Sequence, residues 1–336
     1  GCNSLASVVI PESVKEIGDY AFKNCSKLSE IKALGQTVFS SDSFEGTPLL
    51  NKPSKDFIIQ GDNLLAYKGK DQEPILPNGI IIISSKAFQS CENITSLTLP
   101  EGVKEVGEKA FSGCSSLASI VIPDSVEKIG REAFFLCKSL ASVVIPEGAK
   151  EIGYRTFCGC GSLVSIVIPE GVKEIGESAF SGCSSLASIV IPEGVVKIGE
   201  SAFKGCSSLA SIAIPESVRK IEDHVFKECG SLTSIVIHDG IKEIGKSAFE
   251  GCNSLASVVI PESVKEIGKS AFWGCSSLTS IVIPEGVERI GSGAFYQCNA
   301  LNQIQLPESL KVIGDYAFRG CVNLSSLVIP KGVEEV

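Results

Sequence analysis

The stretch SLASIVIPEGVVKIGESAFKGC, residues 185–206, decides the fold because close copies of it recur every 23 residues along the chain. The prolines from Pro77 to Pro330 keep this spacing, and His238 occupies the one slot without a proline. No repeat between them gains or loses a residue, although free loops tolerate insertions. Each position of the unit should therefore belong to a turn, a strand or the core, which is typical of a repeat array and not of a catalytic domain.

The first half of a unit predicts a β-strand. Leu117, Ile120 and Ile122 form the L-x-x-I-x-I pattern of a leucine-rich-repeat strand. Because side chains alternate along a strand, Ile120 and Ile122 should point one way while Ser119 and Val121 point the other. The proline that follows has no N–H to donate to a neighbouring strand, so the strand should end there.

The second half of a unit predicts a short extended segment and a turn. Val126 and Ile129 are spaced for a second strand on the opposite side of the coil. Ala133, Phe134 and Cys137 should then close the unit as a single helical or 3₁₀ turn that fills the interior. One unit cannot bury these apolar groups alone, so neighbouring units must stack.

The repeat is interrupted once, from Leu34 to Leu76. Within this segment, Asp56–Gly69 has two apolar runs around a Gly-Asp-Asn turn, which predicts a β-hairpin. Since the chain starts and stops inside a repeat and contains no methionine, we expect an array that is truncated at both ends. We interpret residues 1–336 as a single domain, with N-terminal repeats over 1–33, an atypical repeat with a hairpin over 34–76, and regular repeats over 77–336.

Composition and charge argue against two classes of partner. Of 336 residues, 44% are hydrophobic and 21% are charged, and no apolar run approaches the roughly 18 residues of a membrane span. The 30 basic and 39 acidic residues give a net charge of −9, whereas phosphate binding needs a basic face. We therefore expect neither membrane insertion in this segment nor a nucleic-acid partner.

The repeated sequence IPEGVKEIGESAFSGCSSL, residues 168–186, resembles the BspA-like (Treponema pallidum type) leucine-rich repeats. The segments FEGTPLL (44–50) and DFIIQGDNLLAYKG (56–69) are similar to a variant repeat of such proteins in gut bacteria. The resemblance covers essentially the whole chain. It implies a mainly β, curved, right-handed leucine-rich-repeat solenoid with a parallel concave sheet, short convex strands and short helical turns. It also implies a secreted or cell-surface protein that contacts host proteins, other microbes or extracellular matrix.

Thirteen of the 14 cysteines hold one position of the repeat and should stack as an interior ladder of buried thiols. We call the equivalent positions of successive repeats rungs. Adjacent rungs lie about 4.8 Å apart, but parallel side chains do not point at each other as a disulfide requires. The exception is Cys158, which we expect to be a single exposed thiol. Its Cys-Gly-Cys spacing with Cys160 is not the C-x-x-C of zinc or redox sites, so no metal is expected.

No combination of residues indicates catalysis. The chain has two histidines, His224 and His238. Each stands at a position where the other repeats have a different residue, so the repeat does not need a histidine there. A Ser-His-Asp triad would need a unique pocket, whereas the serines recur at identical positions. Glycine-rich turns such as GCGS lack the strand–loop–helix context of phosphate binding. We therefore expect a chain that is not an enzyme, with no catalytic residue and no cofactor.

An acidic residue follows the proline position in most repeats. Like charges on neighbouring rungs repel, and a calcium-binding edge is one interpretation. We favour a solvated edge that flanking pairs such as Lys173–Glu174 and Lys265–Glu266 neutralise. The row consists of Glu12, Glu101, Asp124, Glu147, Glu170, Glu193, Glu216, Asp239, Glu262, Glu285 and Glu308.

The concave face is the expected working surface. Its outward positions form ladders of serine and valine, which suit either stacking alone or a flat, weakly apolar groove for a partner. Uniform rungs cannot fix the register of a ligand, so binding should involve the rungs that differ. These are Glu30 and Lys32 beside the interruption, and Asn302, Gln303 and Gln305 near the C-terminal end.

Exposed aromatic residues form a second candidate patch. Trp273 and Tyr296 hold the same repeat position one rung apart, and Tyr316 lies near the next rung. A strip of aromatic side chains suits contacts with protein or sugar.

Together these features favour a non-enzymatic, cell-surface or secreted recognition and adhesion protein. Its partner would be an extracellular protein, a matrix, host or microbial surface component, or a glycan. The alternative is a structural spacer or scaffold that displays another domain, which the identity of Gly1–Gly18 with Gly251–Gly268 favours. A glycan-binding module is the third interpretation.

Overall fold

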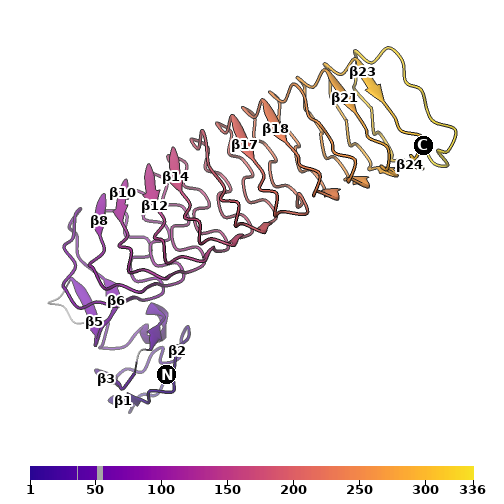
Figure 1. Ribbon diagram of the computed structural model, residues 1–336. Helices are drawn as coiled ribbons and strands as arrows, with labels where there is room; N and C mark the ends of the chain where they lie inside the picture. The colour runs from indigo at the N-terminus through magenta and orange to yellow at the C-terminus, as the bar shows by residue number, and fades with distance from the viewer. Residues whose placement is uncertain (36, 51–55) are drawn as a thin grey trace. The chain divides into compact units, whose positions relative to one another are not determined.

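The computed structural model describes residues 1–35, 37–50 and 56–336, which form two compact units, Gly1–Cys160 and Gly161–Val336. Each unit is a stack of coils, and a coil typically contributes a main strand of three or four residues and a second strand of two (Figure 1). Strands of successive coils pair in parallel, as β17 pairs with β18. The prediction of a mainly β leucine-rich-repeat solenoid with parallel strands is confirmed.

In the first unit, β1 pairs with β3, and β8, β10 and β12 form one sheet of main strands. The second strands pair separately, β2 with β4, and β7 with β9 and β11. The main strands are β1 (Ser7–Ile10), β3 (Glu30–Ala33), β8 (Ser96–Thr98), β10 (Ser119–Val121) and β12 (Ser142–Val144). The second strands are β2 (Glu16–Ile17), β4 (Val38–Phe39), β7 (Ile82–Ile83), β9 (Glu105–Val106), β11 (Lys128–Ile129) and β13 (Glu151–Ile152).

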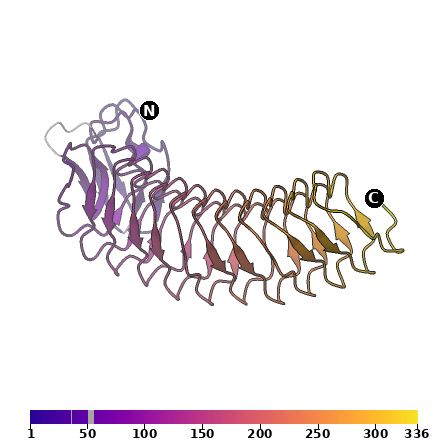
Figure 2. The same cartoon turned by 90° about the horizontal axis from the view of Figure 1, so that it is seen from above.

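The second unit repeats the same plan without interruption, and its coils follow one another in sequence order (Figure 2). The main strands are β14 (Ser165–Val167), β17 (Ser211–Ala213), β18 (Ser234–Val236), β21 (Ser280–Val282) and β23 (Gln303–Gln305). The second strands are β15 (Glu174–Ile175), β16 (Lys197–Ile198), β19 (Glu243–Ile244), β20 (Glu266–Ile267), β22 (Arg289–Ile290) and β24 (Val312–Ile313). Of these second strands, β19, β20, β22 and β24 form one sheet.

The main strands bury every second side chain. In β18, Ile235 is buried while Ser234 and Val236 are exposed, and the same pattern recurs in the other Ser-x-Val strands. After each strand the proline position begins a turn, as where the Val264 N–H donates to the Pro261 carbonyl oxygen at 3.1 Å. Period-two alternation therefore divides each strand between the core and solvent.

The sequence predicts a single helical or 3₁₀ turn at the end of each coil, and the structure has isolated hydrogen bonds between residues three apart there without a continuous helix. The backbone N–H groups of this turn alternate between two kinds of partner. The Phe249 N–H donates to the Ala271 oxygen of the next coil at 2.8 Å, whereas the Cys252 N–H donates to the Phe249 oxygen at 3.1 Å. A regular helix needs its N–H groups for its own segment, so the bonds between coils prevent one. In the described part of the chain the only helix is η1 (Ser41–Phe44), and no helix there has the length and apolarity to cross a membrane.

A column of stacked phenylalanine rings fills the interior of each unit. In the second unit, the Phe249 and Phe272 rings lie 5.3 Å apart between centroids and the Phe272 and Phe295 rings 5.4 Å. All three side chains are fully buried. Each pair of rings adds about 0.5–1.5 kcal/mol beyond the area that it buries.

The interruption in the first unit contains the one antiparallel strand pair, β5 (Phe57–Gln60) with β6 (Asn63–Tyr67), among the described residues. Between the two strands, Gly61 has a φ of +62°, a backbone conformation that glycine adopts without strain. On its other side β6 pairs in parallel with β7, so the hairpin extends the sheet of second strands. Residues 36 and 51–55 of the expected atypical repeat lie outside the described residues, and the division of the chain into segments stays a prediction.

Candidate functional site

The outward side chains of the main strands form a surface that we call the main-strand face, and the sequence assigns it to the concave side. In the second unit its valines are 60–80% exposed, at positions 167, 190, 236, 259 and 282. The serines two residues before them carry no charge. Such a ladder is apolar enough to bind a partner but offers the same groups at every rung.

In the second unit Ala213 replaces the valine of one rung, and another rung has both its serine and its valine replaced by glutamine. β23 pairs with β21, which places Gln303 beside Ser280 and Gln305 beside Val282. The side chains of Asn302, Gln303 and Gln305 are exposed or partly exposed, and their amide groups have no hydrogen-bond partner among the described residues. With Ser280, Val282 and Ser326 they line a hollow of about 390 Å³. The structure thus brings three of the predicted residues into one place.

Glu30 and Lys32 lie in the first unit. Both side chains are exposed on β3, where Glu30 pairs with Ser7 of β1 and Lys32 with Val9. They replace the serine and valine of a regular rung with a pair of opposite charges. This pair of charges belongs to the first unit, and the rung of Asn302 to the second.

The aromatic residues form one cluster in the second unit. The Trp273 and Tyr296 rings lie 4.6 Å apart between centroids at a tilt of 48°. The Arg319 guanidinium lies 5.9 Å from the centre of the Tyr296 ring and 5.4 Å from that of Tyr316. Arg319 was not predicted as part of the strip, although its spacing of 23 residues from Tyr296 was a usable signal.

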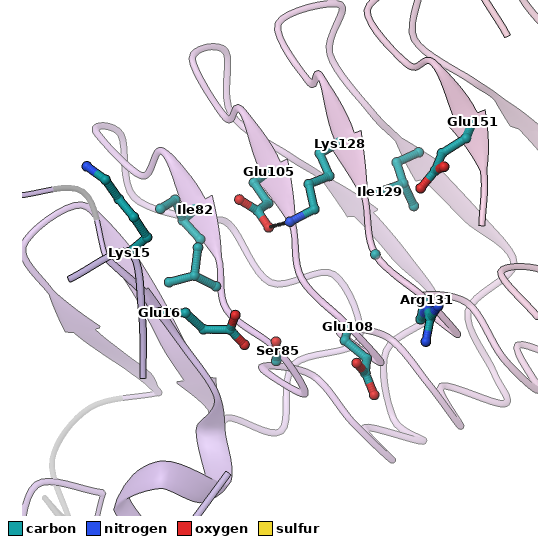
Figure 3. A pocket seen from close by; sticks show the side chains of 12 residues that line it. Lys15, Glu16, Ile82, Ser85, Glu105, Glu108, Lys128, Ile129, Arg131 and Glu151 are labelled. Carbon is teal, nitrogen blue, oxygen red and sulfur yellow. Dashed lines mark hydrogen bonds and ion pairs between the residues drawn. The ribbon is translucent and has the colours of Figure 1, made fainter. Parts of the chain in front are cut away.

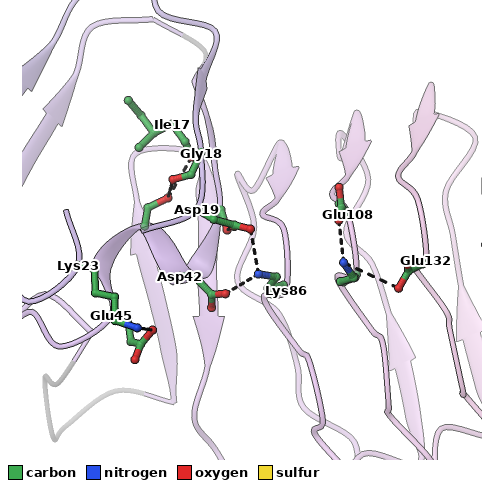
Figure 4. Close-up of polar contacts among 12 residues, drawn as sticks. Ile17, Gly18, Asp19, Lys23, Asp42, Glu45, Lys86, Glu108 and Glu132 are labelled. Carbon is green, nitrogen blue, oxygen red and sulfur yellow. Dashed lines mark hydrogen bonds and ion pairs between the residues drawn. The ribbon is translucent and has the colours of Figure 1, made fainter. Parts of the chain in front are cut away.

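A charged contact joins the N-terminal coils of the first unit to its regular coils (Figure 4). The Lys86 ammonium, whose side chain is 11% exposed, pairs with Asp19 at 3.2 Å and with Asp42. Ser40 donates a hydrogen bond to Asp19, and this bond lowers the pKa of the carboxyl group. Burial opposes the charged form of Lys86, but its hydrogen bonds to Asp42 and Asp19 outweigh that effect and raise its pKa. The contact spans the interruption, and sequence reasoning missed it.

Beside this contact lies a hollow of about 540 Å³ that the sequence did not indicate (Figure 3). Side chains of both signs line it, among them Glu16, Arg131 and Glu151. The Lys128 ammonium and the Glu105 carboxylate on its wall pair at 2.7 Å. Because its charges are mixed and partly paired, the hollow does not select one sign of ligand.

The acidic row is not neutralised in the expected way. Glu174 pairs with Lys197 at 2.6 Å and Glu266 with Arg289 at 3.6 Å, so the flanking carboxylates bind cations of the next coil and not their own neighbours Lys173 and Lys265. No member of the row forms an ion pair among the described residues. In residues 1–35, 37–50 and 56–336, no three His, Cys, Asp or Glu side chains are grouped as metal ligands.

The cysteines of the repeat position form the expected interior column. The Cys252 thiol donates to the Phe226 oxygen at 3.2 Å, and the Cys275 thiol to the Phe249 oxygen at 3.2 Å. Burial raises the pKa of Cys137, Cys229 and Cys298 to about 12. The expectation for Cys158 is wrong in one respect, since this residue is half-buried and not exposed. Its position directly follows a core phenylalanine, and Ser112 at the same position is also buried.

The two histidines lie apart from any such grouping. His224 is partly buried in a closing turn, and His238 begins a proline-type turn, where its Nδ1 accepts the Gly240 N–H at 3.0 Å. The chemistry that the described residues offer is therefore that of surfaces: amide groups, aromatic rings, valine methyl groups and unpaired carboxylates.

A stack of short parallel strands with an exposed Ser/Val face and an interior Phe/Cys column defines a leucine-rich-repeat solenoid. This fold typically serves as a binding scaffold. The chain belongs to the BspA-type leucine-rich repeat family, whose model matches residues 1–56, 60–187, 179–283 and 219–336. The resemblance in the repeated sequence is thereby confirmed.

Solved structures from gut bacteria are similar to this chain. A leucine-rich repeat protein from Bacteroides ovatus is 32% identical over 96% of this chain and 78% of its own, with a TM-score of 0.69. A leucine rich cell surface protein from Faecalibacterium prausnitzii is 28% identical over 96% and 86%, with a TM-score of 0.54. A leucine-rich repeat protein from Eubacterium ventriosum is 25% identical over 79% and 81%, with a TM-score of 0.58. None of the curated proteins matches the chain.

Proposed function

We propose that the chain is a non-enzymatic recognition and adhesion protein of the cell surface or the extracellular space. It binds a host, matrix or microbial macromolecule through the main-strand face. The observation that carries this proposal is the rung of Asn302, Gln303 and Gln305, which opens a polar hollow in an otherwise uniform Ser/Val ladder.

The chemistry of this rung suits a protein partner. Each side-chain amide both donates and accepts hydrogen bonds, as the backbone of a bound polypeptide does. The exposed Val282 beside the rung supplies apolar contact. Glu30 and Lys32 offer the corresponding irregular surface on the first unit, where a charged partner residue could bind.

The proposed location at the cell surface rests on similarity to a solved structure. The relative from Faecalibacterium prausnitzii is described as a cell surface protein, and it is 28% identical over 96% of this chain. We carry that location over to this chain as part of the proposal.

The test is a capture experiment with a matched variant. The chain is immobilised and exposed to a panel of extracellular matrix proteins, host surface proteins and whole microbes. A second surface carries the regularised-rung variant Asn302→Ala, Gln303→Ser, Gln305→Val, which gives this rung the outward residues of the regular rung at Ala256, Ser257 and Val259. A partner that the wild-type chain binds and the variant does not supports the proposal. Absence of any partner, or equal capture by both surfaces, contradicts it.

A spacer that displays another domain is the second candidate. It is favoured by the 18 identical residues of Gly1–Gly18 and Gly251–Gly268, because selection for length alone leaves repeats alike. For a spacer, replacing Asn302, Gln303, Gln305 and Trp273 together would change no binding at all. Deleting one complete coil of 23 residues would instead shorten its reach and reduce its function.

A further inference from the structure

Three aromatic rings and one arginine gather on the closing turns of the second unit, away from the main strands. Trp273, Tyr296 and Arg319 each follow a core phenylalanine, at successive rungs. The core rings beneath them are parallel within 1°, which aligns the turns in a regular column. Trp273 remains 39% exposed and Tyr316 65% exposed. Such exposure of large rings in an otherwise polar turn region marks a candidate contact site.

A glycine lies beside Tyr296 in the closing turn. Two residues before each core phenylalanine the backbone has a positive φ, and in the second unit Gly293 is the one glycine at that position. The others carry side chains, such as Ser270 and Tyr316. A Cβ at Gly293 would lie 3.8 Å from Cβ of Tyr296 and 3.5 Å from Oγ of Ser270. A side chain there would therefore contact Tyr296 and Ser270 within the cluster.

An unpaired cation completes the cluster. The Arg319 guanidinium lies near the Tyr296 and Tyr316 rings, at 5.9 and 5.4 Å from their centres. No carboxylate forms an ion pair with it in the described part of the chain. By contrast, Lys227 and Glu250, which hold the same repeat position in earlier coils, pair with each other at 2.9 Å. An anionic group of a ligand is the partner that Arg319 lacks.

The size of the cluster favours a sugar over a protein. The cluster spans two rung steps of about 4.8 Å, or roughly 10 Å. The exposed surface area of its three rings is far smaller than the roughly 800 Å² per partner that a stable protein interface buries. Pyranose rings present C–H groups on one face, which pack against aromatic rings. We propose that this cluster binds an acidic saccharide, with a pyranose ring on Trp273 and Tyr296 and a carboxylate or sulfate group on Arg319.

The experiment uses the intrinsic fluorescence of the chain, because Trp273 is its single tryptophan. The full chain is first applied to an array of neutral, uronic-acid, sialylated and sulfated oligosaccharides. The strongest acidic ligand and its neutral counterpart are then titrated while tryptophan emission is followed. We expect emission to change with the acidic ligand and binding to be at least tenfold weaker for the neutral one. The carboxylated and sulfated members of the array distinguish the two anionic groups.

Variants separate the roles of the residues. Arg319→Gln should weaken the acidic ligand about tenfold and leave the neutral one unchanged. Trp273→Phe should weaken both, and its binding is measured on the array because this variant has no tryptophan. Tyr20→Ala is the matched control, since Tyr20 is an exposed ring with a lysine 4.5 Å from its centre in the first unit. The proposal fails if no acidic oligosaccharide binds, if Arg319→Gln changes nothing, or if this patch captures only proteins. The regularised-rung variant should bind the saccharide normally, so failure here and failure of the proposed function are distinguishable.

Discussion

Most interior thiols of the repeat position lie beside a phenylalanine carbonyl of the preceding coil, as Cys229 lies 3.2 Å from the Phe203 oxygen. That oxygen also accepts a backbone N–H from its own turn, since the Cys206 N–H donates to it at 3.1 Å. Most cysteines of the column are buried, and burial disfavours the thiolate. These cysteines therefore act as small apolar residues with one weak hydrogen bond and not as nucleophiles.

We predict selective labelling of the cysteines. When the folded chain is treated with iodoacetamide at pH 8, Cys2 should react first because it is exposed, and half-buried Cys158 should follow more slowly. The ten buried cysteines should react only after unfolding. Peptide mass spectrometry reads the result site by site. Modification of Cys252 or Cys275 in the folded chain would contradict the buried column.

The raised thiol pKa values predict loss of stability in alkali. The pKa of Cys137, Cys229 and Cys298 is about 12 in the folded chain and about 8.5 when unfolded. Their contribution is thus fully present below pH 8.5 and is lost as pH rises toward 12. Each thiol should lower the free energy of unfolding by about 1.4 kcal/mol per pH unit above 8.5. Urea unfolding between pH 7 and 10 measures this, and Cys229→Val should flatten the dependence.

The phenylalanine column should dominate local stability. Replacing Phe249, which is fully buried between two rings, with alanine should cost about 3–5 kcal/mol. Val236→Ala in the same coil is the control, because that side chain is 73% exposed and its loss should change stability by about 0.5 kcal/mol or less. Hydrogen exchange of the surrounding coils measures both. Equal effects of the two substitutions would show that the column does not hold the coils together.

At the scale of elements, the coils are joined by three kinds of bond. Main strands pair through their backbones, closing turns donate N–H groups to the next coil, and charged side chains of the second strands pair between coils. The ion pairs are mostly exposed, so each contributes less than about 1 kcal/mol. The positions of these ion pairs still favour correct stacking of the coils, because Lys197 meets Glu174 only when successive coils are in register.

The contact of Lys86 with Asp19 and Asp42 should hold the N-terminal coils of the first unit in place. Lys86→Met removes a cation that is 11% exposed and leaves two carboxylates without it, which should cost about 1–3 kcal/mol. We expect residues 1–50 to become sensitive to limited proteolysis while residues 80–160 stay resistant. Lys104→Met is the matched control, since its pair with Glu127 is exposed. Unchanged cleavage in Lys86→Met would contradict this role.

The elements differ in how far the sequence could predict them. The Ser-Ile-Val strands and proline turns follow from period-two alternation and from proline lacking an N–H, and both are local properties. The closing turn contains bonds between residues three apart, as the predicted helical or 3₁₀ turn requires, but the sequence could not show that the Phe249 N–H bonds to the next coil. The contact between Lys86 and Asp19 joins residues 67 apart across an interruption that breaks the repeat register, so no spacing rule could pair them.

For the whole chain, regularity explains how the array is built, and the departures from it provide its individual surfaces. The amide rung at Gln303, the charged rung at Glu30 and the aromatic cluster at Trp273 all interrupt ladders of otherwise constant residues. The sequence located these residues because a repeat array makes every substitution visible. It could not predict the hollow at Gln303 or the position of Arg319 between two tyrosines, because these depend on side-chain packing between coils.

The most direct test of the central claim is the affinity of the wild-type chain and the regularised-rung variant for the partner found by capture. Both should have the same circular dichroism and the same melting temperature, since the variant only introduces exposed residues that a regular rung, such as residues 256–259, already carries. We predict that the variant binds at least tenfold more weakly, equivalent to about 1.4 kcal/mol. Equal affinity of the two proteins would contradict the claim that the irregular rung carries recognition.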